Sequence, residues 1–371
     1  MRPVGTRSTV EAADASPWLQ ESPIPLAQRY DVALLDLDGV VYVGRHAVAG
    51  APDALAAARA AGMRLAFVTN NAARPPTDVA AHLRELGIAA DADEVITSSQ
   101  AAAGYLADRL PPAAKVLVVG TTGLIEALRE RGLDPVFSAD DDPVAVVQGY
   151  SPTLDWKQLA EGAVAINRGA LWVATNVDPT VPSRRGPLPG NGSLVAALRH
   201  ATGAVPIVTG KPEPTMHRET VVRSGAQAPI VVGDRLDTDV EGANATGCPS
   251  LLVLSGVTTP QELLAADPVH RPTYLAHDLS GLLRAHPGAG ADHGTGRCGR
   301  WTAVADASAL RVSRDASSTS TPDTPSDGDD LDVLRALCAA AWTAPQPADG
   351  WRIEPVDGVA RSVLEAGELL A

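Results

Sequence analysis

Short apolar segments alternate with longer Ala- and Leu-rich segments from Tyr30 to about Leu283, and this alternation limits the possible folds more than any other feature of the sequence. Most of the short segments have only four or five residues, are rich in Val, Ile and Leu, and lack the polar alternation of a half-exposed strand. Such segments are typical of strands in a parallel sheet that is buried on both faces. The pattern therefore predicts an α/β fold.

The segments give specific expectations for strands and helices. Strands are expected at residues 32–35, 65–69, 116–119, 144–147, 171–174, 206–209, 230–232 and 251–254, with further strand character at 300–312 and 351–355. Helices are expected at residues 52–61, 77–86, 100–110, 123–131, 156–167, 193–201, 214–223, 239–246 and 331–342.

The two ends of the chain depart from this pattern. Residues 1–29 are polar and interrupted by Pro, so we expect a flexible leader. Residues 286–371 predict a small α+β C-terminal module. Within it, the Ser-, Thr-, Pro- and Asp-rich run at residues 315–330 predicts a flexible linker, and we expect the module to be loosely attached.

Composition excludes several classes of partner. The chain of 371 residues has 30 basic and 44 acidic side chains, a net charge of −14, which argues against nucleic acid or an anionic membrane surface as the main partner. No run approaches the roughly 18 apolar residues of a membrane helix, and no apolar signal segment is apparent at the N-terminus. The three cysteines are widely spaced and predict neither a disulfide framework nor a zinc site. We therefore expect a cytoplasmic protein.

The first motif, Asp36-Leu37-Asp38-Gly39, directly follows the strand expected at residues 32–35. Carboxylates at positions i and i+2 leave a strand on the same side, and Gly39 permits a sharp turn. A calcium loop also begins Asp-x-Asp, but its fifth, sixth and twelfth positions are here Val40, Val41 and Ala47, which excludes an EF-hand. Taken alone, the pair could also be two solvated turn residues.

The second motif is Thr69-Asn70-Asn71, at the end of the next expected strand. A hydroxyl, two amides and free backbone N–H groups at a strand end suit a phosphate. Taken alone, the same residues are ordinary for the start of a helix.

The third motif, Gly210-Lys211-Pro212, places one of only three lysines of the chain in a rigid turn after an expected strand. A fixed ammonium can neutralise a phosphate or keep a carboxylate ionised. An exposed loop lysine is the competing interpretation.

The fourth motif is Gly233-Asp234-Arg235-Leu236-Asp237-Thr238-Asp239, which has three acids within six residues after a strand. A carboxylate cluster without His or Cys suits a hard cation such as Mg²⁺.

In this order, at the carboxyl ends of strands, the four motifs resemble those of the haloacid dehalogenase (HAD) superfamily of aspartate-nucleophile phosphotransferases. The second and fourth motifs are similar to the p-nitrophenylphosphatase-like class, which carries a large α/β cap between motifs two and three. The resemblance implies a Rossmann-like core with a parallel sheet at residues 30–98 and 203–285, and an inserted α/β cap at residues 99–202. Within that cap, residues 174–179 resemble the substrate-specificity loop of the class.

The chain also resembles bacterial glycerol-3-phosphate phosphatases, in which a small acetyltransferase-like module follows the HAD region. This resemblance implies that glycerol phosphate is hydrolysed to glycerol and phosphate. An acetyl-CoA site requires a Gly-rich pyrophosphate loop that opens a helix, and residues 286–371 contain none. We therefore expect no transferase activity there.

The resemblance also implies a magnesium site and its chemistry. Mg²⁺ would be held by Asp36, the backbone carbonyl of Asp38 and Asp234, with Asp239 in support. Asp36 would attack phosphorus and form an aspartyl-phosphate. Asp38 would protonate the leaving alkoxide and then deprotonate the attacking water.

The remaining motif residues are implied to bind the phosphoryl group. Lys211 would supply positive charge as a catalytic and substrate-binding residue, and Thr69 with the Asn70 backbone would bind phosphoryl oxygens. Gly39 and Asn71 would support the site. The class often dimerises through the cap, so a homodimer through the cap is one oligomeric state that the sequence leaves open.

Other functions remain open on the sequence alone. One is a HAD phosphatase for another small monoester, such as phosphoglycolate, pyridoxal phosphate or a nucleoside monophosphate. Another is a sugar-phosphate mutase or phosphotransferase on the same fold. A third is a non-catalytic metabolite-binding protein.

Overall fold

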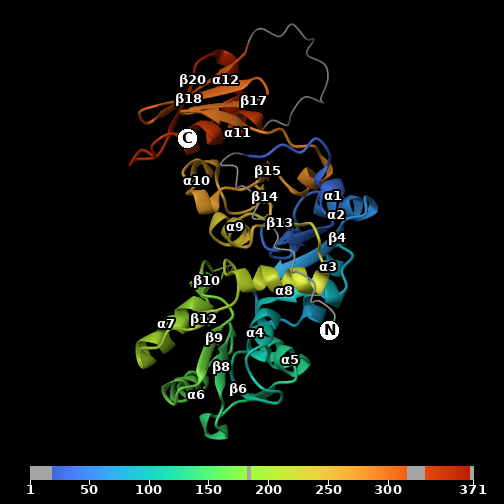
Figure 1. Cartoon of the computed structure of the whole chain (residues 1–371), viewed down its shortest axis with the longest axis vertical. Helices are drawn as coiled ribbons and strands as arrows, with labels where there is room; N and C mark the ends of the chain where they lie inside the picture. Colours follow the sequence, from blue (N-terminus) through green and yellow to red (C-terminus); the bar gives the residue numbers. More distant parts are fainter. Residues whose placement is uncertain (1–18, 182–184, 316–330, 368–371) are drawn as a thin grey trace, which may run out of the picture.

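The computed structural model describes residues 19–181, 185–315 and 331–367. Three larger sheets, each packed against helices, follow one another along the long axis of the molecule (Figure 1). Residues 1–18 of the expected leader and residues 316–330 of the expected linker lie outside the described residues. Within the described residues, no helix is long and apolar enough to span a bilayer. The α/β class predicted from the sequence is confirmed.

The sheet in the middle of the molecule is parallel throughout, with β1 and β13 as its two central strands. In spatial order its strands are β15 (Tyr274–Ala276), β14 (Ser250–Val253), β13 (Pro229–Gly233), β1 (Val32–Leu35), β4 (Arg64–Thr69) and β5 (Val95–Thr97). The helices of this part are α1 (Leu26–Arg29), α2 (Ala51–Ala60), α3 (Pro76–Glu85), α4 (Ser98–Ala107), α8 (Pro214–Ser224), α9 (Glu241–Thr246) and α10 (Pro260–Leu264).

Strand β1 is buried on both faces, as its sequence predicts. Ala33 and Leu35 pack on the side of α2 and α3, whereas Val32 and Leu34 pack on the side of α4, α8 and α9. All four side chains are at most 1% exposed. An apolar strand without alternation is thus the consequence of helices on both sides of a parallel sheet.

The second sheet is also parallel and lies at one end of the molecule (Figure 1). Its strands, in spatial order, are β12 (Ile207–Val208), β9 (Leu171–Ala174), β8 (Ala145–Gln148), β6 (Lys115–Val119) and β7 (Asp134–Val136). Helices α4 and α5 (Thr122–Glu130) pack on one face, and α6 (Trp156–Asn167) and α7 (Asn191–Thr202) on the other. A short antiparallel ribbon, β10 (Thr180–Val181) with β11 (Leu188–Pro189), projects from this part toward the middle sheet.

The middle and second sheets share elements in a way that the sequence did not indicate. Helix α4 contributes Ala101 to the core of the middle sheet and Leu106 to the core of the second. Strand β12 lies in the second sheet, although residues 203–285 were expected in the HAD core. Strands β5, β7 and β15 were not predicted, because three residues are too few to show a pattern.

The described part of the expected leader is packed rather than flexible. Leu19 and Leu26 are 3% and 0% exposed. The backbone of Ser22 exchanges two hydrogen bonds of 2.8 Å with the backbone of His286. The expectation of a flexible segment is therefore wrong for residues 19–29.

The third sheet forms the C-terminal module and is mixed. Its strands, in spatial order, are β16 (Gly290–Asp292), β17 (Thr295–Cys298), β18 (Trp301–Asp306), β19 (Ala309–Arg314) and β20 (Arg352–Pro355), of which only the β19–β20 pair is parallel. Its helices are α11 (Asp332–Thr343) and α12 (Gly358–Ala366). Residues 315–330 therefore connect β19 to α11 inside the module, and do not join the module to the core.

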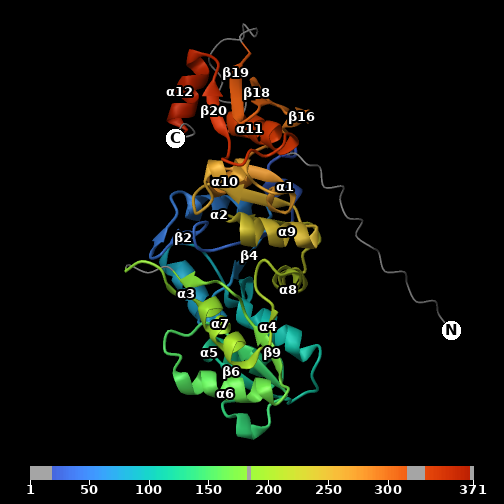
Figure 2. The same ribbon diagram turned by 90° about the vertical axis from the view of Figure 1, so that its left-hand side faces the viewer.

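Helix α11 fixes the module to the middle part, so the expectation of a loose attachment is wrong. It lies between the third sheet and α10 in both views (Figures 1 and 2). Arg335 donates to the carbonyl of Leu275 in β15 at 2.7 Å, and Trp342 Nε1 donates to the carbonyl of Leu263 in α10 at 3.0 Å. One apolar cluster joins side chains of α11 to Leu252 and other residues of the middle part.

We expect Arg335→Met to lower the free energy of unfolding by about 3–5 kcal/mol, as for other broken buried ion pairs. Arg335 is 1% exposed and also donates to Asp332 Oδ1 at 3.0 Å, so the variant removes a buried cation and a donor together. Urea denaturation followed by circular dichroism measures the change. Arg352→Met is the matched control, because that side chain is 71% exposed, and it should change the value by less than about 1 kcal/mol. Equal effects of the two variants would contradict the expectation.

Candidate active site

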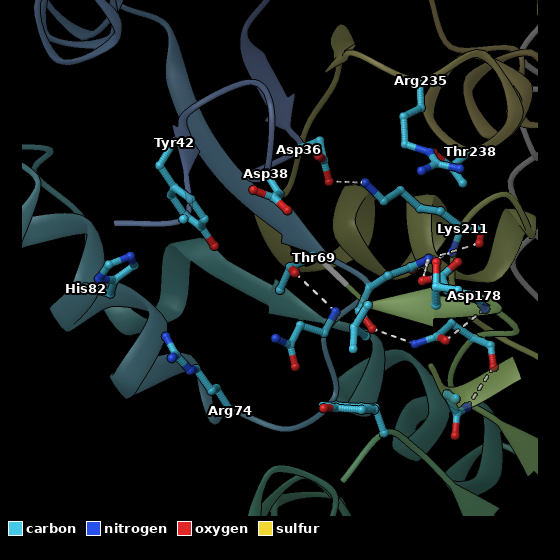
Figure 3. Close-up of a pocket in the computed structure, with 18 of the residues that line it drawn as sticks. Asp36, Asp38, Tyr42, Thr69, Arg74, His82, Asp178, Lys211, Arg235 and Thr238 are labelled. Atoms are coloured by element: carbon cyan, nitrogen blue, oxygen red, sulfur yellow. Dashed lines mark hydrogen bonds and ion pairs between the residues drawn. The ribbon is translucent and has the colours of Figure 1, made fainter. Parts of the chain in front are cut away.

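A cavity of about 1440 Å³ lies between the middle sheet and the second sheet. Its walls come from the segments that follow β1, β4 and β13, from Lys211, and from Asn176 and residues 178–181 of the second part (Figure 3). Parallel α/β sheets place their functional loops at the carboxyl ends of strands, and here several such ends meet at one cavity. Residues of all four motifs therefore come together, as the sequence predicted.

Asp36 and Asp38 both line the cavity, on the same side of the segment that continues β1. Leu37 between them is 1% exposed and belongs to the core of the middle sheet. The Asp36 N–H donates to the carbonyl of Val232 in β13 at 2.8 Å, which extends the sheet by one residue. Burial raises the pKa of Asp38, which favours its protonated form.

Lys211 joins two of the motifs by ion pairs. Its Nζ donates to Asp36 Oδ1 and, at 2.7 Å, to Asp239 Oδ1. The lysine side chain is only 4% exposed. Burial alone would lower its pKa, but Asp239 and Asp36 outweigh burial and raise it, so the ammonium stays charged. The interpretation of Lys211 as an exposed loop residue is excluded.

Three carboxylates form a cluster suited to a cation. Asp36, Asp234 and Asp239 each place an oxygen within 4.8 Å of the others. Burial raises the pKa of Asp36 to about 7, against the opposing effect of Lys211, and burial with the charge of Asp239 raises that of Asp234 to about 6. Asp38, which was predicted to contribute its backbone carbonyl, is not in this side-chain cluster.

The surroundings of Asp234 fit a small hard cation. Its Oδ2 accepts from the N–H of Val257 at 2.7 Å, whereas its buried Oδ1 has no hydrogen-bond partner among the described residues. A Cβ atom at Gly39 or Gly256 would overlap this carboxylate, so both glycines leave the room that it needs. An all-oxygen donor set with one unused buried oxygen is the chemistry that Mg²⁺ requires.

The second motif lies where the sequence placed it, but its side chains are engaged. Thr69 Oγ1 accepts from the Asn71 N–H at 3.1 Å, and Asn71 Oδ1 accepts from the Ala73 N–H at 2.9 Å. The Asn70 side chain turns to Lys211, with its Oδ1 accepting from the Lys211 N–H at 2.8 Å. This contact was not predicted from the sequence, because the two residues are 141 positions apart.

Several cavity residues were not singled out from the sequence. Asp178 lies in the expected specificity loop and receives a hydrogen bond from Asn70 Nδ2 at 3.3 Å. Burial raises its pKa. Tyr42, Arg74 and Arg235 also line the cavity (Figure 3). Asp178 lies in the expected specificity loop and Arg235 in the fourth motif, so the sequence pointed to their segments. For Arg74, the only indication in the sequence was its place five residues after Thr69.

His217 was also missed, and it lies beneath the site rather than in it. It is 1% exposed, and neither ring nitrogen has a hydrogen-bond partner among the described residues. Burial, with the nearby Lys211 ammonium, lowers its pKa to about 4, so the ring is neutral near pH 7. A charged imidazole here would be repelled by Lys211 and would compete with it for Asp239.

Comparison with known families and proteins agrees with this geometry. The haloacid dehalogenase-like hydrolase model matches residues 33–134, the HAD-hydrolase-like model matches residues 208–282, and a GCN5-related N-acetyltransferase-like domain matches residues 298–368. A D-glycerol 3-phosphate phosphatase of Mycobacterium tuberculosis is 46% identical over 355 residues, which is 93% of this chain and 96% of the relative.

Solved structures give the same result. A glycerol phosphate phosphatase from Mycobacterium tuberculosis in complex with magnesium has a TM-score of 0.82 at 46% identity, over 94% of this chain and 100% of that one. A p-nitrophenyl phosphatase from Archaeoglobus fulgidus has a TM-score of 0.63 at 32% identity, over 68% of this chain and 98% of that one. The resemblance predicted from the four motifs is confirmed, and the chain belongs to the haloacid dehalogenase-like hydrolase family.

Proposed function

We propose that the chain is a Mg²⁺-dependent phosphomonoesterase that hydrolyses glycerol 3-phosphate to glycerol and phosphate. The observation that carries the proposal is the meeting of Asp36, Lys211, Asp234 and Asp239 in one cavity. The substrate follows from the relative in Mycobacterium tuberculosis, which is similar over nearly its whole length and is a D-glycerol 3-phosphate phosphatase.

Mg²⁺ would be held by Asp36, Asp234 and the backbone carbonyl of Asp38, with Asp239 in support. When ionised, the three clustered carboxylates and the Lys211 ammonium leave two negative charges, which a divalent cation balances. When bound, the cation would screen the repulsion between a phosphate dianion and the attacking carboxylate. Magnesium and calcium complexes of the similar phosphatase support this choice.

In this mechanism Asp36 attacks the phosphorus atom in line and forms an aspartyl-phosphate. The Lys211 ammonium, Thr69 and the Asn70 backbone N–H bind the phosphoryl oxygens, where charge spreads in the transition state. Asp38 gives its proton to the leaving alkoxide and then takes a proton from the water that cleaves the acyl-phosphate. The raised pKa of Asp38 supports the first of these steps.

The remaining expectations complete the proposal. We propose the HAD core at residues 30–98 and 203–285, the cap at residues 99–202 and the module at residues 286–371, with β12 as the part of the core segment that pairs with the cap sheet. We further propose a cytoplasmic enzyme that forms a homodimer through the cap.

A phosphate-release screen tests the function. With Mg²⁺ present, we expect one glycerol phosphate enantiomer to give the highest kcat/KM among glycerol phosphates, phosphoglycolate, pyridoxal phosphate, nucleoside monophosphates and sugar phosphates. A tenfold preference for another monoester would refute the substrate and keep the phosphatase. Phosphate transfer to a hydroxyl acceptor without release would indicate a mutase, and no turnover of any monoester would refute the enzyme.

We expect Asp36→Asn to abolish turnover and Asp38→Asn to retain phosphorylation of Asp36 by p-nitrophenyl phosphate. The second variant loses proton transfer, which typically contributes about 10²–10⁴-fold, but nitrophenolate leaves without protonation. Quenched-flow measurements should show a small burst of nitrophenolate followed by very slow hydrolysis, and mass spectrometry should find one phosphoryl group on the Asp36 peptide. A phosphoryl group on another residue would refute the assigned roles.

We expect Mg²⁺ to raise the Tm more at about pH 8 than at about pH 5.5, because protons compete with the cation for raised-pKa carboxylates. Because folding raises the pKa values of Asp36 and Asp234, the metal-free fold is more stable at low pH, where both carboxyl groups are protonated. This contribution to stability is lost as the pH rises through about 6 to 7. Differential scanning fluorimetry measures both effects.

Two variants control the Tm experiment. Asp234→Asn should abolish the Mg²⁺-dependent increase, whereas Asp140→Asn, at a side chain 86% exposed, should behave as the wild type. An increase of equal size at both pH values would contradict a carboxylate site.

A further inference from the structure

The side-chain amide of Asn70 clamps the backbone of the residue that carries the site's buried ammonium. Its Oδ1 accepts from the Lys211 N–H at 2.8 Å, and its Nδ2 donates to the Lys211 carbonyl at 3.2 Å. An amide is the side chain that can serve both groups at once, since it offers an acceptor and a donor. Alanine offers neither, and a carboxylate offers only the acceptor.

The clamp acts on a residue whose position has electrostatic consequences. The Lys211 Nζ reaches both Asp36 and Asp239, and its side chain is 4% exposed. Gly210, next to it, allows the clamp to close, because a Cβ atom there would overlap the Thr175 carbonyl and crowd Asn70 Oδ1. A backbone shift of Lys211 would therefore move a buried charge relative to its two carboxylates.

The same residue is bound to the second part of the molecule. Asn70 Nδ2 also donates to Asp178 Oδ2 at 3.3 Å, and the Asn70 carbonyl accepts from Asn176 Nδ2 at 2.8 Å. Asn176 in turn accepts from the Asp178 N–H at 3.2 Å, so residues 176–178 meet Asn70 as one braced loop. Asn70 is thus a junction between Lys211 and this loop.

We propose that the Asn70 side chain is a positioning residue for Lys211, and that through Asp178 it makes the placement of the ammonium depend on docking of the loop at residues 176–178. This inference rests on the proposed phosphatase function, for which Lys211 is the charged group. Undocking of the loop would remove one of the three hydrogen bonds of the Asn70 amide and loosen the clamp. With the loop at residues 176–178 docked, by contrast, all three hydrogen bonds would hold the Lys211 ammonium in place.

A double-mutant cycle between Asn70→Ala and Lys211→Ala tests the first part. With p-nitrophenyl phosphate in single-turnover experiments, we expect Lys211→Ala to lower the rate by about 10²–10³-fold. Asn70→Ala alone should lower it at least about tenfold, but by less than about twofold when Lys211 is already Ala. Effects that multiply would show that Asn70 does not act through Lys211 and would overturn the proposal.

The Kd of inorganic phosphate, measured by isothermal titration calorimetry in the presence of Mg²⁺, gives a further double-mutant cycle for the same two variants. This measurement decides the question if the double variant is too slow to assay. Coupling between the two variants supports the proposal, and independent effects on Kd overturn it. Asn244→Ala is the matched control, because its amide also donates to two backbone carbonyls, of Val269 at 2.8 Å and of Arg271 at 3.1 Å, outside the cavity. It should leave rate and Kd within about twofold in either background.

A second cycle, Asp178→Ala with Asn70→Ala, tests the dependence on the loop. We expect Asp178→Ala to lower the single-turnover rate severalfold in the wild type and to have little effect when Asn70 is Ala. Independent effects would refute the link to the loop. If the wild type hydrolyses no monoester, the proposed function fails, and the phosphate-binding cycle still decides the positioning role.

Discussion

The buried contact of Lys211 with Asp36 and Asp239 is the interaction on which the rest of the site depends. Removing charges from water is costly, and a buried group is tolerated only when partners surround it. Burial raises the pKa values of Asp36 and Asp234, and the single ammonium of Lys211 does not balance the three acids of the cluster, so it does not cancel this effect. This imbalance is a destabilising feature of the metal-free protein and a source of affinity for a divalent cation.

The parallel sheet makes this concentration of charge possible. Residues that follow β1, β4 and β13 meet because neighbouring parallel strands end at the same edge. The apolar residues of β1 are buried on both faces, so the loop that carries Asp36 starts from a rigid strand. Rigid support is what a site of fixed charges needs, because a small displacement weakens each interaction.

The sequence predicted those parts of the fold that have local patterns. Strand β1 and the pair of Asp36 and Asp38 were predicted together, because an apolar run and its following motif are contiguous. The direction of the Asn70 side chain was not, because its partner is 141 positions away. Strand β15 was missed for a related reason, since three residues become a strand only through the neighbours that they pair with.

The position of α11 gives the C-terminal module a structural role. All its residues from Asp332 to Trp342 are buried, because the third sheet lies on one side and the middle part on the other. A helix buried on all sides packs against both parts within one apolar cluster, so neither part can separate without exposing apolar surface. Residues 298–368, which are similar to an acetyltransferase-like domain, therefore also pack against the middle part through α11. Since fold alone does not define function, this packing is a physical reason for the module to be retained that requires no second reaction.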